Sequence, residues 1–230
     1  MILFSEIFNR AVNLFDDPDI RQSYINNPAG YEIDMRPFLV NGLNKFTYPT
    51  EITDKLTQYS DPQGAQEVFN GDGGATYSLD TTPVDGSSFS YKIGDEFVRG
   101  EYNAEDNTVT FPRAIEEDEE CTVVWYFAGA FTADFSNILR GDFNRGAIME
   151  KIKNILAHCI LSAWGDNEMN RAIEFRNNFS DSDLGFYSPA NSATAKKDWH
   201  NQINRDLDTL VVDLCWRIGS TPKGGSRFGK

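Results

Sequence analysis

The chain has 230 residues, of which 40% are hydrophobic and 13% aromatic, and this apolar content excludes an intrinsically disordered protein. Asp and Glu outnumber Lys and Arg by 35 to 21, so the formal net charge of −14 disfavours general binding to nucleic acid or anionic membranes. No apolar run reaches the roughly 18 residues that a membrane-spanning helix needs, and we expect a protein that is neither secreted nor membrane-spanning.

The three cysteines, Cys121, Cys159 and Cys215, have no spacing typical of a metal site. Their odd number disfavours a complete set of intrachain disulfides, so a reducing compartment fits best. The sequence contains no cofactor motif, and we expect neither a metal nor a cofactor.

The first third of the chain has helical periodicity. The first predicted helix follows a cap at Ser5 and is stopped by Pro18, and one of its faces carries most of its apolar residues: Ile7, Phe8, Ala11, Val12, Leu14 and Phe15. A polar turn at 26–30 leads to a second helix at 35–46, with Pro37 in its first turn. Residues 50–59 form a third short helix.

From about Val68 to Phe131 the periodicity becomes that of β-strands. Alternation of apolar and polar residues predicts five strands, at 75–79, 89–93, 97–102, 108–111 and 122–127. Short strands at such intervals are typical of a β-sandwich or small barrel. The acidic run Glu116–Glu120 is interpreted as a solvated turn that also discourages pairing at the sheet edge.

The last third returns to helical periodicity. A long helix is expected at 144–164, a bend or break at Gly165-Asp166, and a further helix at 167–179. The final helix is expected to end at Gly219, with an apolar stripe formed by Trp199, Ile203, Leu207, Leu210, Leu214 and Ile218.

These elements together predict an α+β protein. The segments 1–63 and 136–219 form a discontinuous helical bundle, and residues 64–135 form an antiparallel β-sandwich or barrel inserted into it. Residues 220–230 form a flexible basic tail.

No set of residues commits the chain to catalysis, and we do not expect an enzyme. His158 and His200 lie within or beside apolar helical stripes, and adjacent helical residues such as His158 and Cys159 point too far apart to act as base and nucleophile. Asp181 and Asp183 lack the glycine and glutamate of a calcium loop. The glycines at 71–74 precede a strand, whereas a phosphate cradle precedes a helix.

The C-terminal tail is the strongest candidate for an interaction site. From Arg217 onward its charged residues are all basic: Arg217, Lys223, Arg227 and Lys230. Phe228 is the kind of aromatic anchor that a docking peptide uses when it becomes ordered on binding. An acidic partner is expected.

Two groups of segments resemble bacteriophage proteins. The phrases Tyr77–Tyr91, Asn107–Phe111 and Thr122–Tyr126 resemble small β-sandwich modules that decorate tailed-phage virion proteins. The helical flanks, the polar connection Asp181–Pro189 and the terminal helix with its basic tail are similar to head-to-tail adaptor (neck) proteins.

The resemblance implies a structural virion protein without catalytic residues. In that family a helical bundle forms a ring beneath the portal and the C-terminal segment docks onto the portal. By segment, the resemblance assigns portal docking to five residues: Arg217, Lys223, Arg227, Phe228 and Lys230. It further implies a homo-oligomeric ring, with twelve copies expected, that binds portal and tail or stopper proteins and conducts DNA without reading its sequence. The protein would assemble in the host cytoplasm and reside in the virion, without contact to a membrane.

Alternatives stay open at this stage. The β-block is large for an adaptor, which leaves stopper, tail-terminator and fibre-attachment roles. A glycan- or host-binding module would use aromatics of the β-block: Phe69, Tyr77, Phe89, Tyr91, Tyr102 and Phe111. A hydrolase would need a deep pocket with at least one carboxyl of shifted pKa.

Overall fold

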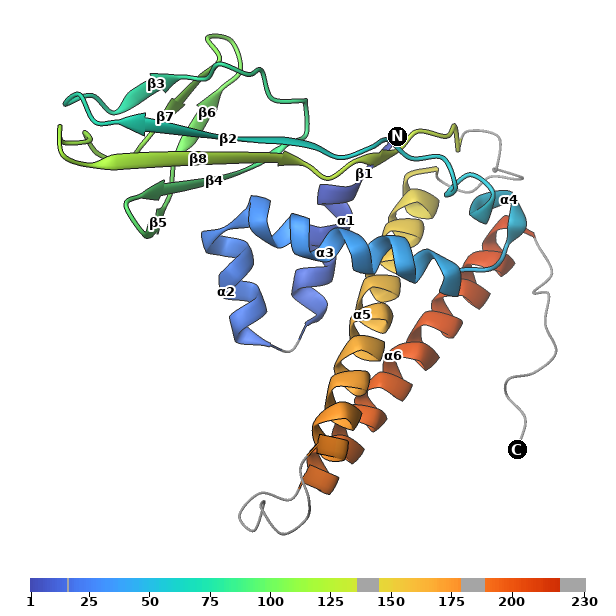
Figure 1. The fold of residues 1–230 in the computed structure, drawn as a ribbon. Helices are drawn as coiled ribbons and strands as arrows, with labels where there is room; N and C mark the ends of the chain where they lie inside the picture. The colour runs from blue at the N-terminus through green and yellow to red at the C-terminus, as the bar shows by residue number, and fades with distance from the viewer. Residues whose placement is uncertain (16, 136–144, 179–188, 220–230) are drawn as a thin grey trace. The chain divides into compact units, whose positions relative to one another are not determined.

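Figure 1 shows the computed structural model, which describes residues 1–15, 17–135, 145–178 and 189–219 of an α+β protein with antiparallel sheets. The chain divides into two compact units. Unit 1 comprises Met1–Arg36 and Gln58–Thr132, and unit 2 comprises Pro37–Thr57 and Ala133–Lys230. Unit 1 therefore contains helices as well as strands. The division at residues 64 and 135 that the sequence predicts stays a prediction.

Unit 1 begins with strand β1 (Ile2–Leu3), helices α1 (Phe4–Leu14) and α2 (Pro18–Asn26), and the first part of α3 (Pro28–Gly42). Helix α2 was not predicted from the sequence. Pro18 starts this helix. Proline has no amide hydrogen, and in the first turn of a helix this hydrogen would have no intrahelical partner. The Asp17 side chain caps the helix by accepting from the Asp19 amide at 2.9 Å.

The predicted start of the second helix at Met35 was wrong. Helix α3 begins at Pro28, and Asn27 is the single residue between α2 and α3, so the expected polar turn at 26–30 does not form. Pro37 lies inside the helix, and the boundary between the two units falls directly before it. A proline removes one hydrogen bond of the helix at this point.

Four of the five predicted strands are confirmed. The single strand predicted at 97–102 was wrong, because residues 99 and 100 separate two short strands that belong to different sheets. The larger sheet has the order β2-β8-β4-β5 (Gln63–Asn70, Glu120–Phe127, Ser88–Ile93, Glu96–Val98), and the smaller has the order β3-β7-β6 (Thr76–Ser78, Thr108–Thr110, Glu101–Asn103). Strand β2 was not predicted as a whole, because only three of its eight residues are apolar. Strand β9 (Ala130–Phe131) pairs with β1.

Both sheets contribute to one hydrophobic core. Its buried residues are Leu79, Tyr91, Ile93, Val109, Phe111, Ile115, Cys121, Val123 and Trp125. In β8 the odd-numbered residues from Cys121 to Phe127 are buried and the even-numbered residues between them are partly buried. Because of this period of two, one face of β8 packs in the shared core and the other faces the helices of unit 1.

Unit 2 contains the second part of α3, the short helices η1 (Leu43–Lys45) and α4 (Thr50–Thr53), and the long helices α5 (Arg145–Asn178) and α6 (Pro189–Ile218), which pack against each other (Figure 1). The predicted break at Gly165-Asp166 was wrong, because α5 passes through it. A β-carbon at Gly165 would lie 2.6 Å from Cδ2 of His200, so this glycine permits close packing of α5 and α6.

Helix α5 has a buried apolar stripe from Ile148 to Ala163. In α6 the buried residues are Ile203, Leu207, Val211, Leu214, Cys215 and Ile218, so Val211 takes the place predicted for Leu210. None of the described helices combines the length and the apolar character needed to cross a membrane.

Gly42 provides a test of the packing between α3 and α5. A β-carbon at this position would lie 2.5 Å from the carbonyl oxygen of Cys159, which is backbone and cannot turn aside. Replacing a helical glycine by alanine ordinarily stabilises a helix by about 1 kcal/mol. We expect Gly42→Ala instead to destabilise the protein by about 1–3 kcal/mol, the usual cost of overpacking.

Urea unfolding followed by circular dichroism measures this effect. Asn41→Ala, at the exposed neighbouring position of the same helix, is the control and should be neutral or slightly stabilising. A Gly42→Ala protein as stable as this control would contradict the close approach.

Candidate functional site

The predicted docking segment begins at the end of α6, where the structure describes Arg217. Its Nε atom donates to both carboxylate oxygens of Asp213 at 3.3 Å, one turn earlier in the helix. Asp213 also accepts a hydrogen bond from Lys151 of α5, and this bond is the main reason that its pKa lies below the ordinary value. The positive charge of Arg217 is therefore partly balanced within unit 2. Lys223, Arg227, Phe228 and Lys230 lie outside the described residues.

Trp216 is the most exposed large hydrophobic residue in the described part of unit 2, with 72% of its surface accessible, and sequence analysis did not identify it. It lies between buried Cys215 and exposed Arg217, off the apolar stripe of α6. A helix residue that falls outside its stripe points away from the packed face, so the periodicity contained this signal. Exposed tryptophan and arginine side by side are typical of residues that contribute most to protein binding.

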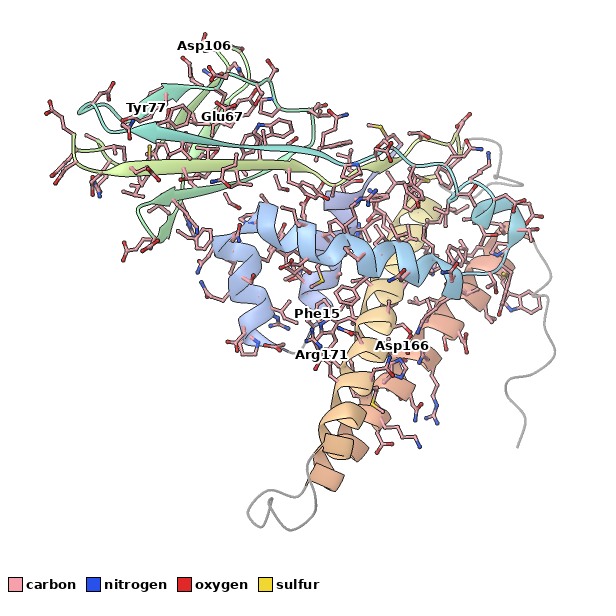
Figure 2. The ribbon with its side chains drawn as sticks, in the orientation of Figure 1. Phe15, Glu67, Tyr77, Asp106, Asp166 and Arg171 are labelled. Atoms are coloured by element: carbon pink, nitrogen blue, oxygen red, sulfur yellow. The ribbon has the colours of Figure 1, made fainter. Side chains whose placement is uncertain are left out.

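A second candidate is a polar network that joins η1, α5 and α6 within unit 2. Lys45 Nζ lies 2.5 Å from Asp166 Oδ2 and donates to Ser162 Oγ at 2.7 Å. His200 Nε2 lies 3.0 Å from Asp166 Oδ1, and Asn204 contacts both Ser162 and His200. Figure 2 labels Asp166 on α5.

Asn204 of α6 links Ser162 and His200. The Ser162 hydroxyl donates to Asn204 Oδ1, and the Asn204 Nδ2 atom lies 3.2 Å from His200 Nε2. Together with the contacts of Lys45, these contacts connect η1, α5 and α6 within unit 2.

This network is suited to structure and not to nucleophilic catalysis. Ser162 is fully buried, so no substrate reaches its hydroxyl, and Lys45 is paired with the Asp166 carboxylate. Asp166 and Lys45 also line an open pocket of about 340 Å³ together with Phe38, Asn41, Ala163, Asn167 and Asn170. The opposite charges within the pocket leave no net attraction for an ionic ligand.

The thiol and histidine considered in the sequence do not form a dyad. His158 Nδ1 lies 2.8 Å from the Asn154 carbonyl oxygen of its own helix, and Cys159 is fully buried. Burial raises the pKa of the Cys159 thiol to about 12, so it stays protonated. All three cysteines are buried and free.

Asp72 has a structural role in unit 1. Asp72 Oδ1 accepts from the Gly74 amide at 2.9 Å and from the Tyr77 hydroxyl at 3.1 Å, which closes the turn before β3. Asp181 and Asp183 lie outside the described residues. Among the described residues, no three side chains of the metal-binding types lie close enough to hold an ion.

The aromatics of the β-block contribute to packing. Tyr91 and Phe111 are buried in the shared core, and Phe69, Tyr77, Phe89 and Tyr102 pack against it. Phe89 stacks on Tyr102 with ring centroids 4.6 Å apart. All six residues are buried in this core or partly buried against it.

The acidic run Glu116–Glu120 lies at the surface as predicted. Glu119 forms two hydrogen bonds of 2.6 Å with Arg113, and this contact lowers the pKa of Glu119 to about 2. The other acids of the run are exposed and extend the negative charge of unit 1.

The formal charge differs strongly between the two units. Unit 1 contains 21 acidic and 6 basic residues, a formal net charge of −15, whereas unit 2 contains 14 and 15, a formal net charge of +1. The whole negative excess of the protein therefore belongs to the unit that contains the sheets.

One carboxyl of unit 1 is buried. Glu32 of α3 is 1% exposed, its Oε1 accepts from the Ser88 hydroxyl of β4, and its Oε2 has no hydrogen-bond partner. Burial raises the pKa of Glu32 to about 7, and the bond from Ser88 opposes this shift. Glu32 lines neither the pocket beside Asp166 nor a groove of about 310 Å³ beside Trp125. It thus lacks the access that a catalytic acid needs.

Comparison of the chain with models of protein families, with curated proteins and with solved structures found no match in any of the three.

Glu32 gives the fold a defined pH dependence. Because its pKa is raised from 4.5 to about 7 on folding, its contribution is most favourable below pH 4.5 and is lost as the pH rises through 7. Glu32→Gln removes the charge and keeps the shape. We expect the variant to exceed the wild type in stability at pH 8 by on the order of 2–3 kcal/mol, and to match it near pH 4.5.

Chemical unfolding at several pH values measures the difference. Glu32 interacts electrostatically with Tyr24 of α2, Tyr31 of α3 and Tyr126 of β8, and these residues are unchanged in the variant. Asp34→Asn, an exposed position of the same helix, is the control. A difference independent of pH would show that folding does not raise the pKa of Glu32.

Proposed function

We propose that this chain is a structural subunit of a tailed-bacteriophage neck, a head-to-tail adaptor whose copies form a ring between the portal and the tail and conduct DNA. The observation that carries the proposal is the exposed Trp216 beside Arg217, at the point where α6 leads into the basic segment 220–230. An aromatic anchor followed by positive charges suits a C-terminal segment that docks onto an acidic partner surface.

The charge distribution supports the proposed DNA passage. Unit 1 carries the formal net charge of −15, and a strongly negative surface repels the phosphates of a passing duplex. Repulsion along the wall keeps DNA from adhering while it moves. The acidic unit is therefore the part of each subunit that we assign to the channel.

In this proposal the helical segments at the two ends of the chain form one discontinuous bundle, and residues 64–135 form a β-sandwich inserted into it. The core shared by the four-stranded and three-stranded sheets supports the sandwich. The fully buried serine and the ion-paired lysine of unit 2 support a structural role over an enzymatic one.

The ring is tested with the purified full-length chain. We expect light scattering to give a multimer and negative-stain images to show closed rings, either for the protein alone or after mixing with the portal protein of the same virus. A protein that stays monomeric alone and with the portal would contradict the adaptor function.

The docking residues are tested separately. Trp216→Ala should leave the fold intact, because the side chain is largely exposed, and should weaken binding to the portal at least tenfold, as removal of a central aromatic anchor does. Thr209→Ala is the control, because Thr209 is exposed two turns earlier on the same side of α6. Equal portal affinity of the two variants would show that Trp216 does not contribute to docking.

A further inference from the structure

The four-stranded sheet of unit 1 has two open edges. Strand β2 has β8 as its one strand neighbour among the described residues, and β5 at the opposite edge has β4. Strand β2 is eight residues long, and the backbone groups on its outer side are a template for pairing with another strand.

One row of side chains crosses this sheet from edge to edge. Val68 of β2 lies opposite Thr122 of β8, Thr122 opposite Lys92 of β4, and Lys92 opposite Phe97 of β5. Residues directly opposite each other point to the same face. The row therefore has an apolar residue at each edge and polar residues between them.

Both ends of the row are exposed to solvent. Val68 is 50% exposed and Phe97 is 39% exposed, and both are among the exposed large hydrophobic residues of unit 1. Lys92 Nζ lies 4.5 Å from the centre of the Phe97 ring and covers part of one side of it. Isolated edge strands usually carry charge or proline at such positions.

The strand directions allow the two edges to meet. All neighbours in the sheet are antiparallel, so β5 runs opposite to β2. A second copy placed beside the first in the same orientation thus presents its β2 antiparallel to β5. A contact of this kind is heterologous, and it generates a ring when the rotation between copies closes.

We propose that copies of this chain join head to tail through these edges, with β5 of one copy paired to β2 of the next and Phe97 packed against the neighbour's Val68. This inference rests on the ring of the proposed function and names the surface that builds it. Pairing of β2 with β2 of a second copy would bury Val68 but leave Phe97 exposed, which is why the observations favour the β5–β2 contact.

Charge opposes the contact at low salt, because two units with a formal net charge of −15 come together. The Debye length falls from about 30 Å at 0.01 M salt to about 10 Å at 0.1 M. The extent of association should therefore rise with salt in this range.

The test uses Val68→Cys and Phe97→Cys in full-length protein, purified separately, mixed in 0.1 M salt and treated with a mild oxidant. Opposite positions of paired strands bring their β-carbons to about 4.5–5.5 Å, close enough for a disulfide after small adjustments. The three native cysteines are buried and should stay unreacted. We expect a covalent dimer in the mixed sample and little in either variant alone.

A variant with both cysteines should give a ladder of covalent multimers. The control pairs Val68→Cys with Asp106→Cys, because Asp106 is exposed in the loop between β6 and β7 of the three-stranded sheet (Figure 2). This pair should not react.

Two outcomes overturn the proposal, whichever oligomers the wild type forms. One is a dimer of Val68→Cys with itself as the main product, and the other is the absence of a disulfide between positions 68 and 97. Rings that form without this disulfide would reject the edge contact and leave the neck function standing. A disulfide ladder from a protein that forms no ring and does not bind the portal would reject the neck function alone.

Discussion

The pairing of strand β8 on both sides is the constraint on which unit 1 depends. Its two edges are taken by β2 and β4, and its odd-numbered residues supply much of the core that the two sheets share. On the other face of the four-stranded sheet, β4 meets α3 through polar contacts: the Ala29 amide donates to Ser90 Oγ at 3.0 Å, and Glu32 accepts from the Ser88 hydroxyl. Polar groups buried between a helix and a sheet need hydrogen-bond partners. Glu32 has a partner at one carboxylate oxygen and none at the other, and its burial makes the contact between α3 and β4 sensitive to pH.

Sequence periodicity predicted the elements whose burial follows a regular pattern. Strands β4, β7 and β8 alternate clearly between apolar and polar residues, and α5 has a clear apolar stripe, because each of these elements has one face in a core. Strand β2 lies at an edge of its sheet. Exposed polar residues such as Gln66 weaken its alternation of apolar and polar residues, so the sequence did not predict the whole strand. Pro18, Pro28 and Gly165 were interpreted as residues of helix ends and turns. The two prolines instead start helices, and the glycine allows a close contact between helices. Local sequence cannot decide between these roles, because neighbouring elements in space make the difference.

The candidate sites show the same limit. Arg217 was predicted as a docking residue from the charge of its segment and from the resemblance to adaptor proteins. The structure adds its bond to Asp213 and the exposed Trp216 beside it. The total charge of −14 concealed the separation into a strongly acidic unit and a nearly neutral one, because the units are discontinuous in sequence. The network of Lys45, Asp166 and His200 was also beyond prediction, since it joins residues more than 100 positions apart.

The edge contact and the acidic charge of unit 1 act against each other, and a closed ring reconciles them. Strand β5 offers only three residues for pairing, and burial of one valine or phenylalanine contributes about 1.5–3 kcal/mol at most. Such a contact between two copies is weak against the cost of association and the repulsion of the units. In a closed ring the last copy forms two contacts at once, and the second forms without a further loss of translational freedom. Open chains would therefore be scarce and complete rings favoured, which is the behaviour that a connector between two preformed structures requires.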